Sequence, residues 1–294
     1  HFASADWGMA PDAAESQRRV RLAQWLSDRK NPLFSRVIAN RLWHYHFGAG
    51  IVETTNDLGF NGTRPSHPEL LDWLATSLWR HDGSLKSLHR TMVLSATYRQ
   101  SSHFREDAAA VDAGNRLLWR REPVRLEAEL IRDAMLASAG DLNREIHGPG
   151  YYDFTTFTHN SQFYQMQDPI GPTFDRRGVY RTWVRSGRNQ FLDVFDCPDP
   201  STKTPVRAVT TTPLQSLALM NNSFAFRVSE NLAAKLAVQY PGDVAAQVAG
   251  VVERIYCRLP SGEESELLSA FARQHGVAAL SRVLFNSNEF LYAP

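Results

Sequence analysis

The chain has 294 residues, of which 43% are hydrophobic and 21% charged, a composition typical of a globular protein with a substantial core. Its 32 basic and 31 acidic side chains leave a formal charge of +1, and no block of like charges provides a footprint for nucleic acid or an anionic bilayer. No apolar run approaches the roughly 18 residues that cross a membrane. We therefore expect neither a nucleic-acid partner nor a membrane span.

The beginning of the sequence reads as an N-terminal extension, residues 1–18, ahead of a single helical domain, residues 19–294. The first residues lack Met and form a loop-like acidic stretch, without a basic end followed by an apolar segment. We therefore expect the chain to be a piece of a longer protein, in which an export signal would lie upstream.

The stretch NPLFSRVIANRLWHYHF, residues 31–47, predicts a central helix with large side chains all round, which is typical of burial on both sides. Arg41 lies among apolar neighbours on the helical wheel, so we expect it to be buried with a carboxylate or main-chain carbonyls as partners. His44 and His46 are two residues apart and point in different directions on a helix, so they cannot chelate one ion. We therefore expect no metal site.

A polar stripe runs along one side of this helix, because Arg36, Asn40 and His44 are spaced one turn apart. The next segment supplies further donors and acceptors suited to a polyol or an anion: Thr54, Asn56, Asp57, Arg64 and His67. Two interpretations stay open. The stripe either faces a ligand site or consists of groups with buried partners, and Asp57 either serves that site or closes an Asx turn.

Further helices are predicted by periodicity and by capping signals. Three pairs have the spacing of a capping box: Ser66 with Glu69, Thr212 with Gln215, and Ser261 with Glu264. Helices are expected in residues 66–80, 85–100, 124–140, 211–224, 243–259, 261–274 and 276–290.

One predicted helix carries a cluster of charges. Arg125, Glu129, Arg132 and Asp133 fall on one side of residues 124–140. Such clusters are usually solvated ion-pair ladders, and we interpret this one, like Arg41, as structural. Paired carboxylates can also act as acid and base, but no spacing favours that role here.

The middle of the chain differs from the rest. Residues 147–173 are rich in Gly, Pro and aromatics without helical period, and RGVYRTWVRS, residues 177–186, alternates like a strand. We predict an insertion of loop and sheet at about residues 147–190, and long segments of this kind are commonly functional. Its aromatic side chains would stack on sugar rings: Tyr151, Tyr152, Phe154 and Tyr164.

The cysteines and the lack of nucleotide-binding motifs give no positive indication of a cofactor or an enzyme class. Cys197 and Cys257 are isolated, without the C-x-x-C-H motif that attaches haem c, so we expect no cofactor on this chain. Whether the two cysteines pair stays open. The sequence contains no Walker loop, no Gly-x-Gly-x-x-Gly after a strand and no Gly-x-Ser-x-Gly elbow, which disfavours nucleotide-dependent and nucleophilic-serine enzymes.

Several long phrases follow one another in a characteristic order. They are NPLFSRVIANRLWHYHFGAGIVETTNDLGFNGTRPSHPELLDWLA, SLKSLHRTMVLSATYRQSS, RLEAELIRDAMLASAG, FDCPDPSTKTPVRAVTTTPLQSLALMNN and LFNSNEFLYAP. Together they resemble the C-terminal domain of unknown function, DUF1553, of planctomycete c-type cytochrome multidomain proteins. The resemblance runs from about Arg19 to the last residue. It implies an exported, redox-linked protein with haem c on a separate domain, in organisms that degrade polysaccharides, and it carries over no catalytic residue.

We expect a mainly α, multi-helix fold with a small strand-and-loop insertion. The function expected is a ligand-binding module, or a catalytic one, acting on carbohydrate. The candidate ligand-binding residues are Arg36, Asn40, His44, Asp57, His67, Tyr151 and Tyr152. The alternative is a structural or docking module for other domains of the parent protein, such as its cytochrome domain. A pocket lined by these residues would favour ligand binding, and full internal pairing would favour the structural role.

Overall fold

The computed structural model describes residues 9–10 and 12–293. These residues form thirteen α-helices and two small antiparallel strand pairs, which confirms the predicted mainly α fold class. They divide into two compact units, one ending at Pro123 and the other spanning Val124–Ala293. No change of composition had suggested this boundary, because the chain passes from Pro123 into a strand without a Gly- or Ser-rich linker.

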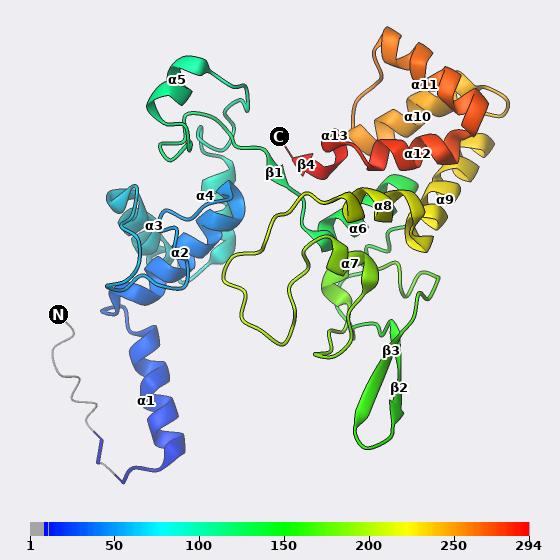
Figure 1. Ribbon diagram of the computed structural model, residues 1–294. Coiled ribbons are helices and arrows are strands. Elements are labelled where there is room, and N and C mark those ends of the chain that lie inside the picture. Colours follow the sequence, from blue (N-terminus) through cyan, green and yellow to red (C-terminus); the bar gives the residue numbers. More distant parts are fainter. Residues whose placement is uncertain (1–8, 11, 294) are drawn as a thin grey trace. The chain divides into compact units, whose positions relative to one another are not determined.

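The first unit contains five helices (Figure 1). They are α1 (Glu15–Ser27), α2 (Pro32–Phe47), α3 (Pro68–Arg80), α4 (Leu85–Val93) and α5 (Glu106–Val111). The helix α2 packs against α3 and α4 around Trp43, Leu74 and Met92. The helix α1 runs across the boundary expected between residues 18 and 19, and it was not predicted because it buries none of its residues and so has no core periodicity.

The second unit is a helical assembly with two strand pairs. Its elements are β1 (Val124–Arg125), α6 (Ala128–Ala139), β2 (Phe154–Thr158), β3 (Gln162–Met166), the 3₁₀ helix η1 (Gly178–Tyr180), α7 (Gln190–Val194), α8 (Pro213–Asn221), α9 (Ser223–Gln239), α10 (Val244–Tyr256), α11 (Gly262–His275), α12 (Val277–Phe285), α13 (Asn288–Leu291) and β4 (Tyr292–Ala293). The strands β1 and β4 pair antiparallel, with Val124 opposite Ala293. This pairing joins the two ends of the second unit.

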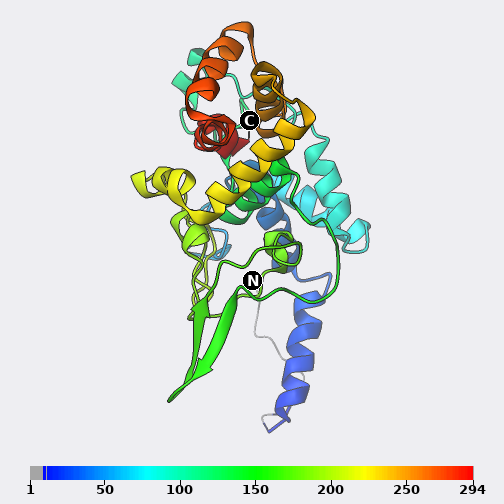
Figure 2. The same ribbon diagram turned by 90° about the vertical axis from the view of Figure 1, so that its right-hand side faces the viewer.

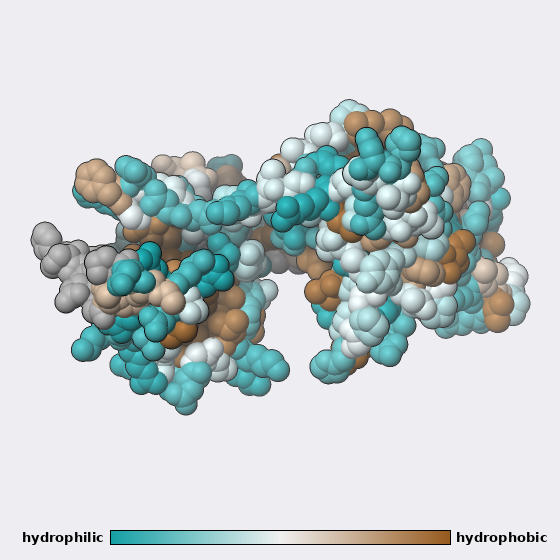
Figure 3. All heavy atoms as spheres, turned by 90° about the horizontal axis from the view of Figure 1, so that it is seen from below, coloured by the Kyte–Doolittle hydropathy of each residue, from teal (hydrophilic) through white to brown (hydrophobic). Residues whose placement is uncertain are grey.

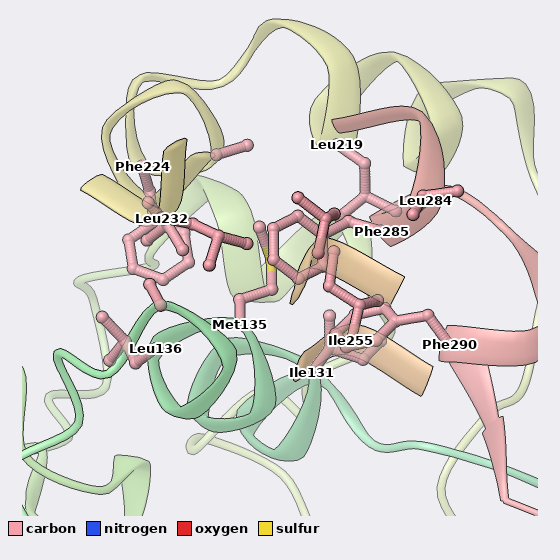
Figure 4. Close-up of a cluster of buried hydrophobic side chains, with 14 of the residues drawn as sticks. Ile131, Met135, Leu136, Leu219, Phe224, Leu232, Ile255, Leu284, Phe285 and Phe290 are labelled. Atoms are coloured by element: carbon pink, nitrogen blue, oxygen red, sulfur yellow. The ribbon is translucent and has the colours of Figure 1, made fainter. Parts of the chain in front are cut away.

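The core of the second unit lies where α6, α9, α10 and α12 meet (Figure 4). Met135, Leu232 and Phe285 are fully buried there. Each such side chain contributes about 1.5–3 kcal/mol by leaving water. The result is a packed helical base that holds α6 in place, and α6 in turn positions the central segment.

The central segment, residues 140–190, contains the predicted insertion of loop and sheet, and its strands are β2 and β3. The strands β2 and β3 form a hairpin in which Phe154 lies opposite Met166 and Phe157 opposite Phe163. Figure 2 shows this hairpin extending away from the helices of its unit. The strand predicted for residues 177–186 is wrong. That stretch begins with η1, because the Gly178 N–H bonds to the carboxylate of Asp133 on α6 instead of to a neighbouring strand.

Two details of the predicted helices also differ. The Ser66–Glu69 capping box does not form, because Ser66 donates its N–H to the carbonyl of Ile51 at 2.9 Å and α3 begins at Pro68. The helix predicted through residue 100 ends at Val93, because the hydroxyl of Ser95 donates to the Met92 carbonyl and so binds the backbone itself. The other two capping boxes are confirmed.

The surface is mixed in character. On the face seen in Figure 3, hydrophobic residues appear as separate patches among hydrophilic ones. Within the described part of the chain, no helix combines the length and the apolar character that a membrane crossing requires. Cys197 and Cys257 are both free thiols.

Candidate functional site

The polar stripe predicted on α2 is paired within the first unit, beginning with Asn40. This side chain is 1% exposed. Its amide nitrogen donates to the Val52 carbonyl at 2.9 Å, and its oxygen accepts the Val52 N–H at 2.8 Å. Gly50 passes so close that a Cβ there would lie 2.9 Å from the Asn40 amide nitrogen. Asn40 therefore anchors the chain that leaves the helix.

Of the other two members of the stripe, Arg36 has partners within the first unit and His44 is half-buried. Arg36 donates its Nε to Asp72 on α3 at 2.6 Å and a second N–H to the Pro32 carbonyl. The same hydrogen bond from Arg36 lowers the pKa of the Asp72 carboxyl. His44 is half-buried, and its pKa is lowered by burial and by the nearby charge of Arg41.

Arg41 does not occupy the buried setting that the sequence predicted. It is half-buried, and its partner is the side-chain oxygen of Asn56 at 3.1 Å, not a carboxylate or a carbonyl. The reason is that the opposite side of α2 faces the core. Phe34 and Tyr45, two of the apolar neighbours of Arg41 on the helical wheel, are 37% and 59% exposed.

The segment after α2 uses its polar groups locally. Asp57 accepts the N–H of Gly59 at 2.8 Å, which is an Asx turn, and its carbonyl accepts the hydroxyl of Thr54 at 2.7 Å. The imidazole of His67 lies 2.9 Å from the Ser66 hydroxyl. The first unit therefore satisfies most of the predicted site residues internally.

A histidine pair lies at the end of α2. The His46 Nε2 and the His89 Nδ1 are 2.7 Å apart, and the guanidinium of Arg121 lies 4.4 Å from the ring centre of Tyr98 beside them. Burial, the neighbouring His89 and then Arg121 lower the pKa of His46. Within the described part of the chain, no three His, Cys, Asp or Glu side chains are placed to hold a metal ion.

In the second unit, the charged residues of α6 hold the central segment instead of forming a solvated ladder. Arg132 donates to the carbonyls of Phe174 and Arg176, and Asp133 accepts the Gly178 N–H at 2.8 Å and 3.0 Å. Burial raises the pKa of Asp133. Arg125, which was predicted on the same helix, lies on β1.

Arg125 makes a different contact, and Glu129 has a strong partner of its own. The guanidinium of Arg125 donates to Gln215 on α8 at 2.8 Å. Glu129 accepts two hydrogen bonds from Arg207, at 2.7 Å and 3.2 Å. The Cys197 thiol lies 3.7 Å from the same carboxylate, and burial together with that negative charge raises the pKa of Cys197 to about 12. This thiol is therefore protonated and unreactive at neutral pH.

A pocket of about 210 Å³ opens between the central segment and the start of α9. Its lining includes Arg132, Tyr151, Asp153, Arg181, Phe224 and Arg227. Tyr151 had been predicted as a ligand-binding residue, and the ring is buried against Phe174, at a centroid distance of 6.1 Å. This pocket is where one of the predicted aromatics meets charged side chains.

The pocket contains a buried ion pair that is only half satisfied. The side chains of Arg181 and Asp153 are 1% and 7% exposed, and the Arg181 Nε donates to the Asp153 Oδ2 at 2.7 Å. Asn189 donates to the same oxygen at 3.2 Å. Both terminal nitrogens of Arg181 and the Oδ1 of Asp153 are buried without a hydrogen-bond partner among the described residues. The guanidinium also lies 4.4 Å from the ring centre of Trp183.

A second hollow, an open groove of about 660 Å³, lies on the hairpin. We call it the hairpin groove, and it is lined by Tyr152, Phe154, Thr155, Thr156, Gln162, Tyr164, Thr182 and Val184. Tyr152 and Phe154 meet edge to face at 5.5 Å, and Phe154 and Tyr164 do so at 5.3 Å. Three of the four predicted aromatics thus share one surface, whereas Tyr151 lines the pocket.

Arg181 and Asp153 were not predicted as site residues, although each carries a weak signal in the sequence. Arg181 is a charged residue inside an alternating run with Tyr180 and Trp183, and Asp153 stands between aromatic residues in YYDF. An ionisable residue within an apolar pattern is rarely buried without a partner or a function.

The second unit is therefore a helical scaffold that carries a polar pocket and an aromatic groove on its central segment. The whole chain belongs to the family described as protein of unknown function (DUF1553), whose model matches residues 18–272 and so runs through both units. No curated protein and no solved structure matches the chain.

Proposed function

We propose that the chain is a ligand-binding module for carbohydrate, and that the hairpin groove is its binding surface. The observation that carries this proposal is the arrangement of Tyr152, Phe154 and Tyr164 beside hydroxyl and amide side chains. Aromatic rings offer flat apolar faces to the C–H faces of sugars, and a few placed polar groups orient a ligand.

The shape and chemistry of the groove favour binding of a polymer over catalysis. The groove lies on a hairpin that extends from the helices of its unit (Figure 2), and it is open to solvent, so a chain of sugars can lie across it. Thr155, Thr156 and Gln162 supply donors and acceptors for hydroxyl groups. Of the described residues that line it, none is an acid, a histidine or a cysteine, so the groove holds no acid–base pair.

The setting that we propose rests on the sequence resemblance. The ordered phrases of this chain are similar to the C-terminal domain of planctomycete c-type cytochrome proteins. In that setting the protein is exported, haem c sits on a separate domain, and the present chain holds a polysaccharide near that redox domain. The partners proposed are therefore the other domains of the parent protein and a glycan.

A second candidate function, a structural or docking module, is favoured by the first unit. Four of the five site residues predicted there have internal partners: Arg36, Asp57, His67 and above all Asn40, with its two hydrogen bonds to Val52. Groups that are already satisfied give a ligand little to bind. We assign the first unit this structural role beside the binding role of the second.

The test is binding of the 294-residue chain to a panel of neutral plant and microbial polysaccharides, followed by calorimetry with oligosaccharides of the glycan retained. Tyr152→Ala and Tyr164→Ala should each weaken binding about tenfold, which corresponds to roughly 1.4 kcal/mol. Tyr45→Ala, an exposed tyrosine on α2, is the matched control. Absence of binding to any glycan, or equal binding by all three variants, would leave the docking role as the better account.

A further inference from the structure

The pocket of the second unit contains buried polar groups that the fold itself does not use. Arg181 makes one hydrogen bond, through Nε, while its two terminal nitrogens have no acceptor among the described residues. Asp153 likewise keeps Oδ1 unpaired. Buried donors and acceptors without partners are costly, and native proteins keep few of them. A ligand that satisfies both groups would remove this cost.

The neighbouring arginines do not share this property. Arg227 forms two hydrogen bonds with Asp175, at 3.0 Å and 3.3 Å, and Arg132 is engaged by Asp133 and two carbonyls. Arg181 is therefore the guanidinium of the pocket with free donors. Since Nε is occupied, the free end consists of the two terminal nitrogens, a fork that matches the two oxygens of a carboxylate.

The remaining groups restrict the charge of the ligand. Asp153 and Asp168 also line the pocket, and a group with two negative charges would meet both carboxylates there. The unpaired Oδ1 of Asp153 needs a donor, which a hydroxyl group supplies. Tyr151 adds an aromatic wall, and a pocket of about 210 Å³ has room for one molecule of roughly monosaccharide size.

We propose that this pocket binds a small hydroxy acid with a single carboxylate, of the class of the sugar acids. Arg181 holds the carboxylate, Asp153 accepts a hydrogen bond from a hydroxyl group, and Tyr151 covers one face. This site is separate from the hairpin groove, and it does not depend on the function proposed for that groove.

The experiment is titration calorimetry of the 294-residue chain with D-glucuronate, D-glucose, inorganic sulfate and inorganic phosphate. Glucuronate should bind at least tenfold more tightly than glucose and than either inorganic anion. Arg181→Gln should weaken glucuronate binding at least tenfold. Equal affinity for glucose and glucuronate would overturn the carboxylate assignment, and preferred binding of sulfate or phosphate would overturn the hydroxy-acid assignment.

A second variant keeps the test decisive if loss of Arg181 unfolds the pocket. Gln167 is exposed and lines the pocket, so Gln167→Glu adds a negative charge without removing a buried group. It should weaken glucuronate binding at least threefold. Gln274→Glu, on an exposed position of α11 outside the pocket lining, adds the same charge and serves as the control. Unchanged affinity in Gln167→Glu would count against the site. Neutral oligosaccharides test the groove separately, so the two proposals succeed or fail on different probes.

Discussion

The two units treat their buried polar groups in opposite ways. In the first, Asn40 is buried and both ends of its amide are bonded to Val52. In the second, Arg181 is equally buried but leaves two nitrogens without a partner, and Asp153 leaves one oxygen. The comparison teaches that a row of polar residues does not mark a site. The mark is hydrogen-bonding capacity that the fold leaves unused beside a cavity.

The difference follows from what each side chain has to hold. The chain turns sharply after α2, and the close approach of Gly50 places the backbone of Val52 against the amide of Asn40. The Arg181 guanidinium lies over the Trp183 ring, which offers attraction to the charge but no acceptor in the plane of its N–H groups. The fold therefore satisfies both ends of the Asn40 amide, whereas it satisfies only one nitrogen of the Arg181 guanidinium.

The largest effect should come from breaking the ion pair of the pocket. Asp153→Ala should lower the free energy of unfolding by about 3–5 kcal/mol, because it leaves the Arg181 charge buried without its carboxylate. Urea denaturation followed by far-ultraviolet circular dichroism measures the loss. Arg19→Ala, which breaks the exposed pair between Arg19 and Glu15, is the control and should cost about 0.5 kcal/mol or less. A similar small loss in both variants would mean that the pair is not buried in solution.

The second largest effect should come from the amide that anchors the first unit. Asn40→Ala should cost about 1–3 kcal/mol, since it strands the N–H and the carbonyl of Val52 inside the protein. Thermal and urea denaturation of the first unit measure this loss. Asn56→Ala removes an exposed amide that bonds Arg41 and should change stability by less than about 0.5 kcal/mol. If Asn40→Ala is as stable as the wild type, the opposite interpretation of the stripe, a ligand site, regains support.

Much of the fold could be predicted because it rests on local signals. The helix predicted at residues 31–47 is observed at Pro32–Phe47. Asn31 caps its start and Gly48 ends it, and both capping residues can be recognised in the sequence. The helix α1 and the short α5 escaped prediction because neither buries a residue. The strand predicted for residues 177–186 does not form, because this stretch alternates for burial of single side chains such as Arg181, not for pairing with another strand.

The candidate site was predictable only in part, and for a related reason. Aromatic content alone pointed to Tyr151, Tyr152, Phe154 and Tyr164, which line the pocket or the hairpin groove. A helical wheel cannot show that Asn40 faces Val52, because that contact depends on the turn after the helix. Nor can spacing show that Arg181 and Asp153, 28 residues apart, form a buried pair.

A smaller effect is expected from the outer member of the stripe. Arg36→Ala should cost about 0–1 kcal/mol, because its ion pair with Asp72 is partly exposed to solvent. A double-mutant cycle with Asp72→Ala measures the coupling between the two side chains, and urea midpoints supply the four free energies. A coupling near 3 kcal/mol would mean that Arg36, like Asn40, is a structural anchor and not half of a weak surface pair.

The smallest effect concerns the histidines of the first unit and its dependence on pH. Burial lowers the pKa of His46, with His89 and Arg121 acting in the same direction, and burial also lowers the pKa of His44. The unfolded chain therefore takes up protons at a higher pH than the folded one. Stability is full above the ordinary histidine pKa of about 6.5 and falls as the pH drops through the lowered folded values.

The geometry of the histidine pair gives this expectation its physical cause. A hydrogen bond between His46 and His89 requires one ring nitrogen without a proton, so protonation of both rings turns the contact into a repulsion. Urea midpoints of the first unit should fall between pH 7 and pH 5, and the fall should be smaller in the double variant His44→Gln with His46→Gln. His275→Gln, on an exposed residue of α11, should leave the slope as it is. A first unit that gains stability on acidification, or whose slope is the same in the double variant, would show that burial does not keep these half-buried histidines neutral in the folded protein. The first unit would then contain polar groups that its fold does not stabilise, and it would differ less from the pocket of the second unit.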